Sequence, residues 1–244
     1  MKKTWNRNRI MNVTGCTLLI MAAALMVLLF LLQYDELWVW YKVYQQKLIE
    51  VERYIESLGI GWKFVLAMLL MFLVRTFVPF LSVSAICVLT GVVLPSYWSV
   101  LVNLAGVVMM MSIQYFIGRR FGSGNAWRFI SRNDRVRRIM EKSGGVNMWM
   151  LLALRLVPGF PISGVSKVYG SMKFPYWKFI LLSSVGFAPK LISYTFIGTN
   201  VYDPLSPAFL VPIITLLIIS GISLLSINLI WFFVEKNGHI RKKR

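Results

Sequence analysis

The chain has 244 residues, of which 57% are apolar and only 15% are charged, and its mean hydropathy is +0.66. A soluble domain usually carries about 25% charged residues, so this composition argues against a water-soluble enzyme and predicts a polytopic membrane protein. The sequence has only two cysteines, both in apolar surroundings, which excludes a disulfide framework.

The basic residues decide the predicted topology. Of the 27 Lys and Arg residues, 17 fall in three clusters, at the N-terminus, in a central loop over 119–145 and in the C-terminal tail. Loops rich in Lys and Arg stay in the cytoplasm, so we expect all three clusters there. Five of the nine acidic residues lie between Gln33 and Leu58, a stretch that we expect outside. Basic clusters can also bind lipid headgroups or nucleic acid, and we favour topology and lipid, without a nucleic-acid partner.

The first predicted elements are a membrane anchor and a surface helix. Ile10 to Leu32 is uncharged and long enough to cross a hydrocarbon core of about 30 Å. No small-residue cleavage site follows it, so we interpret it as an uncleaved anchor. Over Lys42 to Leu58, apolar residues recur at alternating steps of four and three, which predicts an amphipathic helix on the outer membrane surface. A lid or partner-docking helix is the alternative.

Three later spans are predicted over Trp98–Ile117, Tyr176–Ile197 and about Phe209–Val234. Two further stretches, Phe64–Pro95 and Val146–Pro175, are hydrophobic but broken. If the first of them crossed fully, the central basic cluster would lie outside, against the charge rule. We therefore predict an all-α fold with four full spans and two re-entrant hairpins that enter from opposite faces. The alternative is a pair of ordinary helices kinked by proline.

An internal repeat supports this assignment, because the two broken stretches and the spans after them match at an offset of 79 to 80 residues. The matched residues are Arg75 and Arg155, Val78-Pro79 and Val157-Pro158, Gly91 and Gly170, Tyr97-Trp98 and Tyr176-Trp177, Gly106 and Gly186, and Phe116-Ile117-Gly118 and Phe196-Ile197-Gly198. Copies that enter from opposite sides form an inverted repeat, as in many transporters. The predicted organisation is an anchor (1–33), a surface segment (34–61), a core (62–200) with repeats 62–118 and 146–198, and a last span with its tail (201–244).

Helix-breaking residues mark the turn of each predicted hairpin. A half-helix of about ten residues rises about 15 Å, which is half the membrane. Non-helical backbone at that depth must be buried in protein or line a wet cavity. We expect the hairpin geometry to depend on Pro79, Gly91, Pro158, Pro161, Gly170 and Pro189.

The predicted membrane segments contain cations but no Asp or Glu, and the single histidine, His239, lies in the basic tail. No metal cluster, catalytic triad or carboxylate pair is recognisable, so we expect neither enzyme activity nor a cofactor. A cation in the membrane normally faces a cavity or a partner, and here the partner is backbone, water or an anionic ligand. Snorkelling to the interface is the alternative. The predicted substrate-binding residues are Arg75, Ser84, Arg155, Ser163, Ser166, Lys167 and Lys190.

The sequence also resembles a known family over about residues 60–200. The residues that carry the resemblance are Arg155-Leu-Val-Pro158-Gly-Phe-Pro161, Gly170, Phe179, Gly186, Pro189 and Ile197-Gly198, with Val78-Pro79, Gly91, Gly106 and Gly118-Arg119 in the first half. They resemble the signature of the DedA superfamily, and more specifically its VTT-domain (SNARE-associated Golgi protein) branch. The resemblance implies two opposed re-entrant hairpins and a role in moving lipids, such as phospholipids or polyprenyl phosphate carriers, between leaflets.

The leading hypothesis is therefore a lipid translocase or scramblase in the plasma membrane of a bacterium, with both termini cytoplasmic. Arg75 and Arg155 would bind the phosphate of an anionic headgroup, while Lys167 and Lys190 line its route. A transporter of a small anionic solute and a membrane scaffold are the alternatives. Expected partners are membrane lipids, and the sequence leaves open the cargo, ion coupling and assembly into a homo-oligomer.

Overall fold

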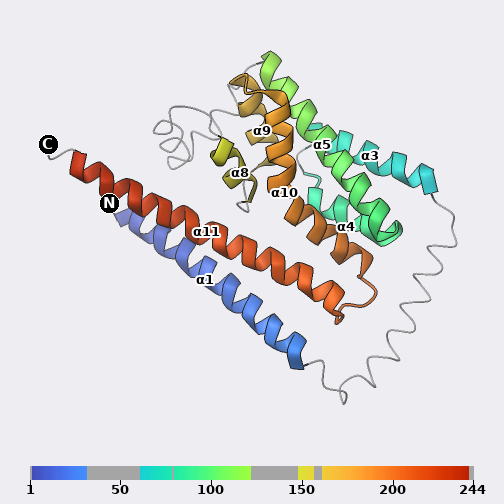
Figure 1. Ribbon diagram of the computed structural model, residues 1–244, viewed down its shortest axis with the longest axis horizontal. Helices are drawn as coiled ribbons and strands as arrows, with labels where there is room; N and C mark the ends of the chain where they lie inside the picture. Colours follow the sequence, from blue (N-terminus) through green and yellow to red (C-terminus); the bar gives the residue numbers. More distant parts are fainter. Residues whose placement is uncertain (1, 32–60, 79, 122–147, 157–160, 242–244) are drawn as a thin grey trace.

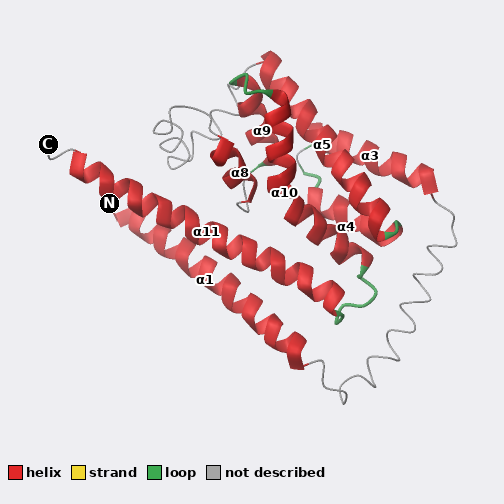
Figure 2. Cartoon of the chain, viewed as in Figure 1, coloured by secondary structure: helices red, strands yellow, loops and turns green. Residues whose placement is uncertain are grey.

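The computed structural model describes residues 2–31, 61–78, 80–121, 148–156 and 161–241, which form helices and turns without a strand (Figures 1 and 2). The helices are α1 (Lys2–Leu31), α3 (Gly61–Phe77), α4 (Val83–Val93), α5 (Ser96–Phe121), α8 (Met148–Leu156), α9 (Ile162–Ser171), α10 (Tyr176–Thr199) and α11 (Pro207–Arg241). The surface helix expected over 42–58 and most of the central basic loop lie outside the described residues.

Four of these helices are long and apolar enough to cross a membrane. Their candidate spans are Asn12–Phe30, Ser96–Phe121, Tyr176–Thr199 and Pro207–Leu225. Each overlaps one of the four spans that the hydrophobic runs predict, so the prediction of an all-helical fold with four long apolar helices is confirmed. The chain is a multi-pass membrane protein.

The first and last of these helices form a layer of their own beside the rest of the molecule (Figure 1). They run antiparallel, since a Cβ added at Gly15 would meet Leu225, and one added at Gly221 would meet Leu19. Small residues at such a crossing let two backbones approach closely. A serine cap and a first-turn proline start α11, where the Phe209 N–H donates to the Ser206 hydroxyl at 3.1 Å.

The remaining helices build the core in two halves, one of α3, α4 and α5 and the other of α8, α9 and α10. Each half contains a helix break. α3 ends at Phe77 and α4 begins at Val83, whereas α8 ends at Leu156 and α9 begins at Ile162. The breaks fall where the prolines predict them, although Pro79 and Pro158 themselves lie outside the described residues. With 11 and 10 residues, α4 and α9 are too short to cross a bilayer.

The two halves are interlocked, because the short helix after each break packs on the long helix of the other half. In one crossing, α4 lies on α10, and a Cβ added at Gly91 would collide with backbone atoms of Thr195 and Gly198. In the other, α9 lies on α5, and a Cβ at Gly118 would collide with the carbonyl of Lys167. Gly198 of α10 and Gly118 of α5, which the sequence repeat matches, therefore occupy corresponding places on the long helices of the two crossings.

Aromatic side chains fill the core where α5, α9 and α10 meet. The rings of Tyr115 and Phe179 lie 4.9 Å apart, and both side chains are fully buried. The Tyr115 hydroxyl donates to the carbonyl of Phe174, in the turn between α9 and α10. Because this contact joins the two halves, it fixes the second half against the long helix of the first.

Candidate functional site

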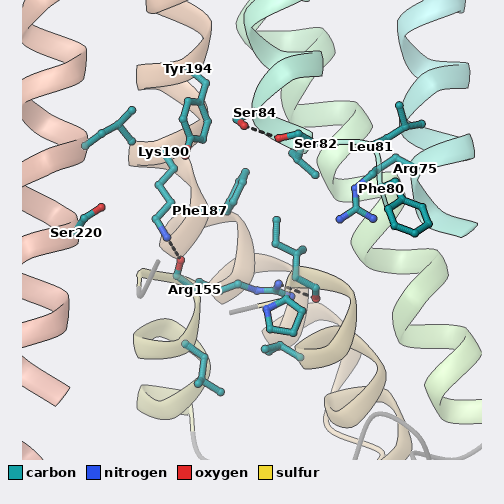
Figure 3. Close-up of a pocket in the computed structure, with 16 residues that line it drawn as sticks. Arg75, Phe80, Leu81, Ser82, Ser84, Arg155, Phe187, Lys190, Tyr194 and Ser220 are labelled. Carbon is teal, nitrogen blue, oxygen red and sulfur yellow. Dashed lines mark hydrogen bonds between the residues drawn. The ribbon is translucent and has the colours of Figure 1, made fainter. Parts of the chain in front are cut away.

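The two helix breaks face a common cavity of about 410 Å³, which we call the central cavity (Figure 3). Residues of both breaks, of α8, α9 and α10, and of the last helix line it. Its polar lining is cationic and hydroxylic, and it consists of Arg75, Ser82, Ser84, Arg155, Lys190, Tyr194 and Ser220. None of the described residues around the central cavity carries a carboxylate. The hollow therefore has an uncompensated positive potential.

The second break is fastened by Arg155, in the last turn of α8. Its side chain is only 3% exposed. Nη1 donates to the carbonyl of Ile162 at 3.1 Å, and Nη2 donates to the hydroxyl of Ser166 at 2.8 Å. The Ser166 hydroxyl in turn donates to the Ile162 carbonyl at 2.9 Å. The guanidinium thus ties α8 to the first turn of α9, across the break in the chain.

The carbonyls at the end of α8 also have partners from other helices. A helix leaves its last four carbonyls without intrahelical donors, and inside a membrane protein these must be satisfied by other groups. Lys190 Nζ donates to the Arg155 carbonyl at 3.0 Å, and the Ser223 hydroxyl donates to the Leu156 carbonyl at 3.3 Å. In the first half, the side-chain amide of Gln114 donates to the Thr76 carbonyl at the end of α3.

Arg75, in the last turn of α3, is placed differently from its repeat partner. Its side chain points into the central cavity from the side opposite to Arg155 (Figure 3). Its Nε atom, like that of Arg155, is buried without a hydrogen-bond partner among the described residues. Such a group costs free energy unless water or a ligand accepts its hydrogen bond. Unlike Arg155, however, Arg75 is only partly buried, and its side chain makes no hydrogen bonds to described residues like those of the Arg155 Nη atoms. Arg75 is therefore the cation best placed to receive an anion.

Both short helices begin at the central cavity, since Val83 and Ile162 line it. At neither start does the side chain of the preceding residue, Ser82 or Pro161, form a capping hydrogen bond. Helix N-termini carry free N–H groups and a partial positive charge, which attract anions. At the ends of α3 and α8, by contrast, the carbonyls of Thr76 and Arg155 are bonded to Gln114 and Lys190.

Of the predicted binding residues, Arg75, Ser84, Arg155 and Lys190 come together around the central cavity. Ser166 lies behind Arg155 as its hydrogen-bond acceptor. Ser163 and Lys167 are on α9 but do not line the cavity. The Ser163 hydroxyl is buried and has no partner within the described part of the chain. The binding roles of all these residues stay predictions.

Sequence reasoning missed several residues that line or build the site, namely Gln114, Tyr194, Ser220 and Ser223. Gln114 could have been found, because an amide in the middle of an apolar span needs a buried partner. The two serines of α11 gave no such signal, since a single hydroxyl can bond to its own helix.

Comparison with known proteins identifies the same region. The model of the VTT domain family matches residues 78–200. The match runs from the first break to the end of α10, so it includes Arg155 and Lys190, and Arg75 lies just before it. No curated protein and no solved structure matches the chain. Because the family model covers half of the sequence, including both helix breaks, the chain belongs to the VTT domain family, the membrane protein family of DedA and SNARE-associated Golgi proteins.

Proposed function

We propose that this protein moves a lipid with an anionic phosphate headgroup, a phospholipid or a polyprenyl phosphate, between the leaflets of a bacterial plasma membrane. The observation that carries the proposal is the side chain of Arg75, which has an unpaired buried nitrogen and points into a cationic cavity at two helix breaks. Membership of the VTT domain family supports the class of function.

The proposal includes a topology in which α3–α4 and α8–α9 are re-entrant hairpins of an inverted repeat. The shortness of α4 and α9 and the interlocked packing of the two halves support it. With the hairpins entering from opposite faces, the three basic clusters and both termini lie in the cytoplasm, as the charge rule requires. The central cavity then lies near the midplane, where a headgroup meets its highest barrier.

In this mechanism, the protein replaces the water around the phosphate during the crossing. Arg75 donates to the phosphate oxygens, and the N–H groups at the starts of α4 and α9 add further donors. Arg155 and Lys190 contribute positive charge while their hydrogen bonds hold the second hairpin in place. The acyl chains stay in the bilayer, so only the headgroup passes through the polar path. No covalent step is involved, and we assign the protein no enzymatic activity.

The test is leaflet exchange of fluorescent lipids in liposomes that contain the purified protein. We expect Arg75→Ala to slow the exchange of phosphatidylglycerol by about tenfold, the effect of one charged hydrogen bond. Lys63→Ala is the matched control, because Lys63 is an exposed cation on the same helix. Equal exchange rates for a folded Arg75→Ala variant and the original protein would contradict the proposal. Uptake of radiolabelled phosphate without lipid movement would favour the small-anion transporter instead.

A further inference from the structure

A second hollow, the α10–α11 groove, lies between the last two helices and has a volume of about 530 Å³. Nearly all of its surface is apolar, and three prolines, Pro189, Pro207 and Pro212, form part of its walls. Of its two hydroxyl residues, Thr215 donates back to the Val211 carbonyl at 2.8 Å, which turns this group toward its own helix. The groove therefore offers its occupant shape and apolar contact rather than hydrogen bonds.

The α10–α11 groove is separate from the central cavity. On α10, Pro189 lines the groove and Lys190 lines the cavity. On α11, Thr215 lines the groove and Leu216 lines the cavity. Consecutive residues of an α-helix point about 100° apart. The two hollows consequently lie on different faces of the same helices, at overlapping levels along α10. A molecule in the groove is thus outside the path that we propose for the headgroup.

The surroundings of the groove indicate what fills it. All nine lining residues belong to the spans Tyr176–Thr199 and Pro207–Leu225, so the groove opens to the hydrocarbon of the bilayer. An empty groove of this size forfeits dispersion contacts along its walls, and water is a poor occupant because it needs several polar partners. The volume lies in the range of protein sites for small ligands. A flexible hydrocarbon chain meets all these conditions.

We propose that the α10–α11 groove binds one acyl chain of a phospholipid that stays with the protein and is distinct from the transported lipid. The chain packs beside Pro189, which has no N–H to donate to its own helix. The next residue is Lys190, whose Nζ holds the Arg155 carbonyl. A resident acyl chain therefore supports the weakest turn of α10, and this is the turn whose Lys190 side chain positions the second break. This inference does not depend on the proposed lipid movement.

The test uses the full-length protein in liposomes with phosphatidylglycerol that carries a diazirine near the end of one acyl chain. After illumination and proteolysis, mass spectrometry locates the adducts. We expect them on groove residues, and we expect Val211→Trp to reduce them by about tenfold, the effect of losing the burial of two methylene groups. The matched control is Ile222→Trp. Val211 and Ile222 are 51% and 53% exposed on α11, and Ile222 lines neither hollow.

Two results would overturn the inference. One is a set of adducts that is spread over the lipid-facing surface and equally strong in a folded Val211→Trp variant. Ala208→Trp, a second change that fills the groove, should then also leave the adducts unchanged. The other is a loss of groove adducts in Arg75→Ala as large as in Val211→Trp, because the bound chain would then belong to the transported lipid. The two proposals can also be separated. If Arg75→Ala exchanges lipids normally while Val211→Trp removes the groove adducts, the proposed function is contradicted and the inference about the groove stands.

Discussion

The two halves of the core share a backbone plan but use their equivalent arginines differently. In the second half, Arg155 is buried and bonded across the break to Ile162 and Ser166. In the first half, Arg75 occupies the matching position, yet it is only partly buried, makes no comparable hydrogen bond across its break and reaches into the central cavity. One arginine thus holds its break in shape through hydrogen bonds, while its counterpart lies in the wall of the cavity.

The largest effect on stability is expected for Arg155→Ala. The change removes two charge-assisted hydrogen bonds and leaves a hole between α8 and α9. We expect a loss of about 3 kcal/mol in the free energy of unfolding. Thermal unfolding in detergent, followed by circular dichroism, measures it, with Lys178→Ala, an exposed cation of α10, as control. An unfolding midpoint equal to that of the original protein would show that Arg155 does not fasten the break.

Substitutions at the two helix crossings should destabilise the protein equally, in contrast to substitutions of the two arginines. Gly91→Val on α4 and Gly170→Val on α9 each place a side chain against backbone of the opposing helix. Because backbone cannot move aside as a side chain can, we expect each change to cost about 2 to 3 kcal/mol. Gly61→Val is the control, since no atom lies within 4 Å of a Cβ there. A large loss for only one of the two crossings would refute their equivalence.

A smaller effect is expected where a polar side chain caps the end of a broken helix. Lys190→Met keeps the length of the side chain but removes the donor to the Arg155 carbonyl, and Gln114→Leu does the same for the Thr76 carbonyl. Leaving a buried carbonyl without a donor costs about 1 to 3 kcal/mol. Both midpoints of thermal unfolding should fall, and less than in Arg155→Ala. If Gln114→Leu had no effect, only the second break would depend on such a cap.

The sequence was sufficient for the parts of the fold that depend on local pattern. Long hydrophobic runs predict the four spans, and prolines such as Pro161 predict the breaks, because apolar length and missing backbone donors act locally. The offset of 79 to 80 residues also placed matched glycines, although it could not show that Gly91 lies on α10 rather than in its own half. Which helix a short segment packs on depends on contacts far apart in the sequence.

The candidate site was harder to predict, because its residues differ in geometry rather than in type. Arg75 and Arg155 are the same residue at matched positions, and they differ in burial and in the hydrogen bonds that Arg155 donates to Ile162 and Ser166. Lys190 could be expected to line a path, but its bond to the Arg155 carbonyl needs the approach of α8 to α10. Lys167 carries the same charge within the second broken stretch and does not line the cavity.

The smallest effect on stability is expected for Arg75→Ala, and this makes it the most informative change. Arg75 has no described bond to lose, so the free energy of unfolding should change by no more than about 0.5 kcal/mol, as for ordinary surface positions. It should even rise slightly, because an unpaired buried nitrogen is removed. The thermal unfolding midpoint tests this in the same series as Arg155→Ala. A drop as large as that of Arg155→Ala would mean that Arg75 also holds its break together, and the contrast between the two halves would disappear.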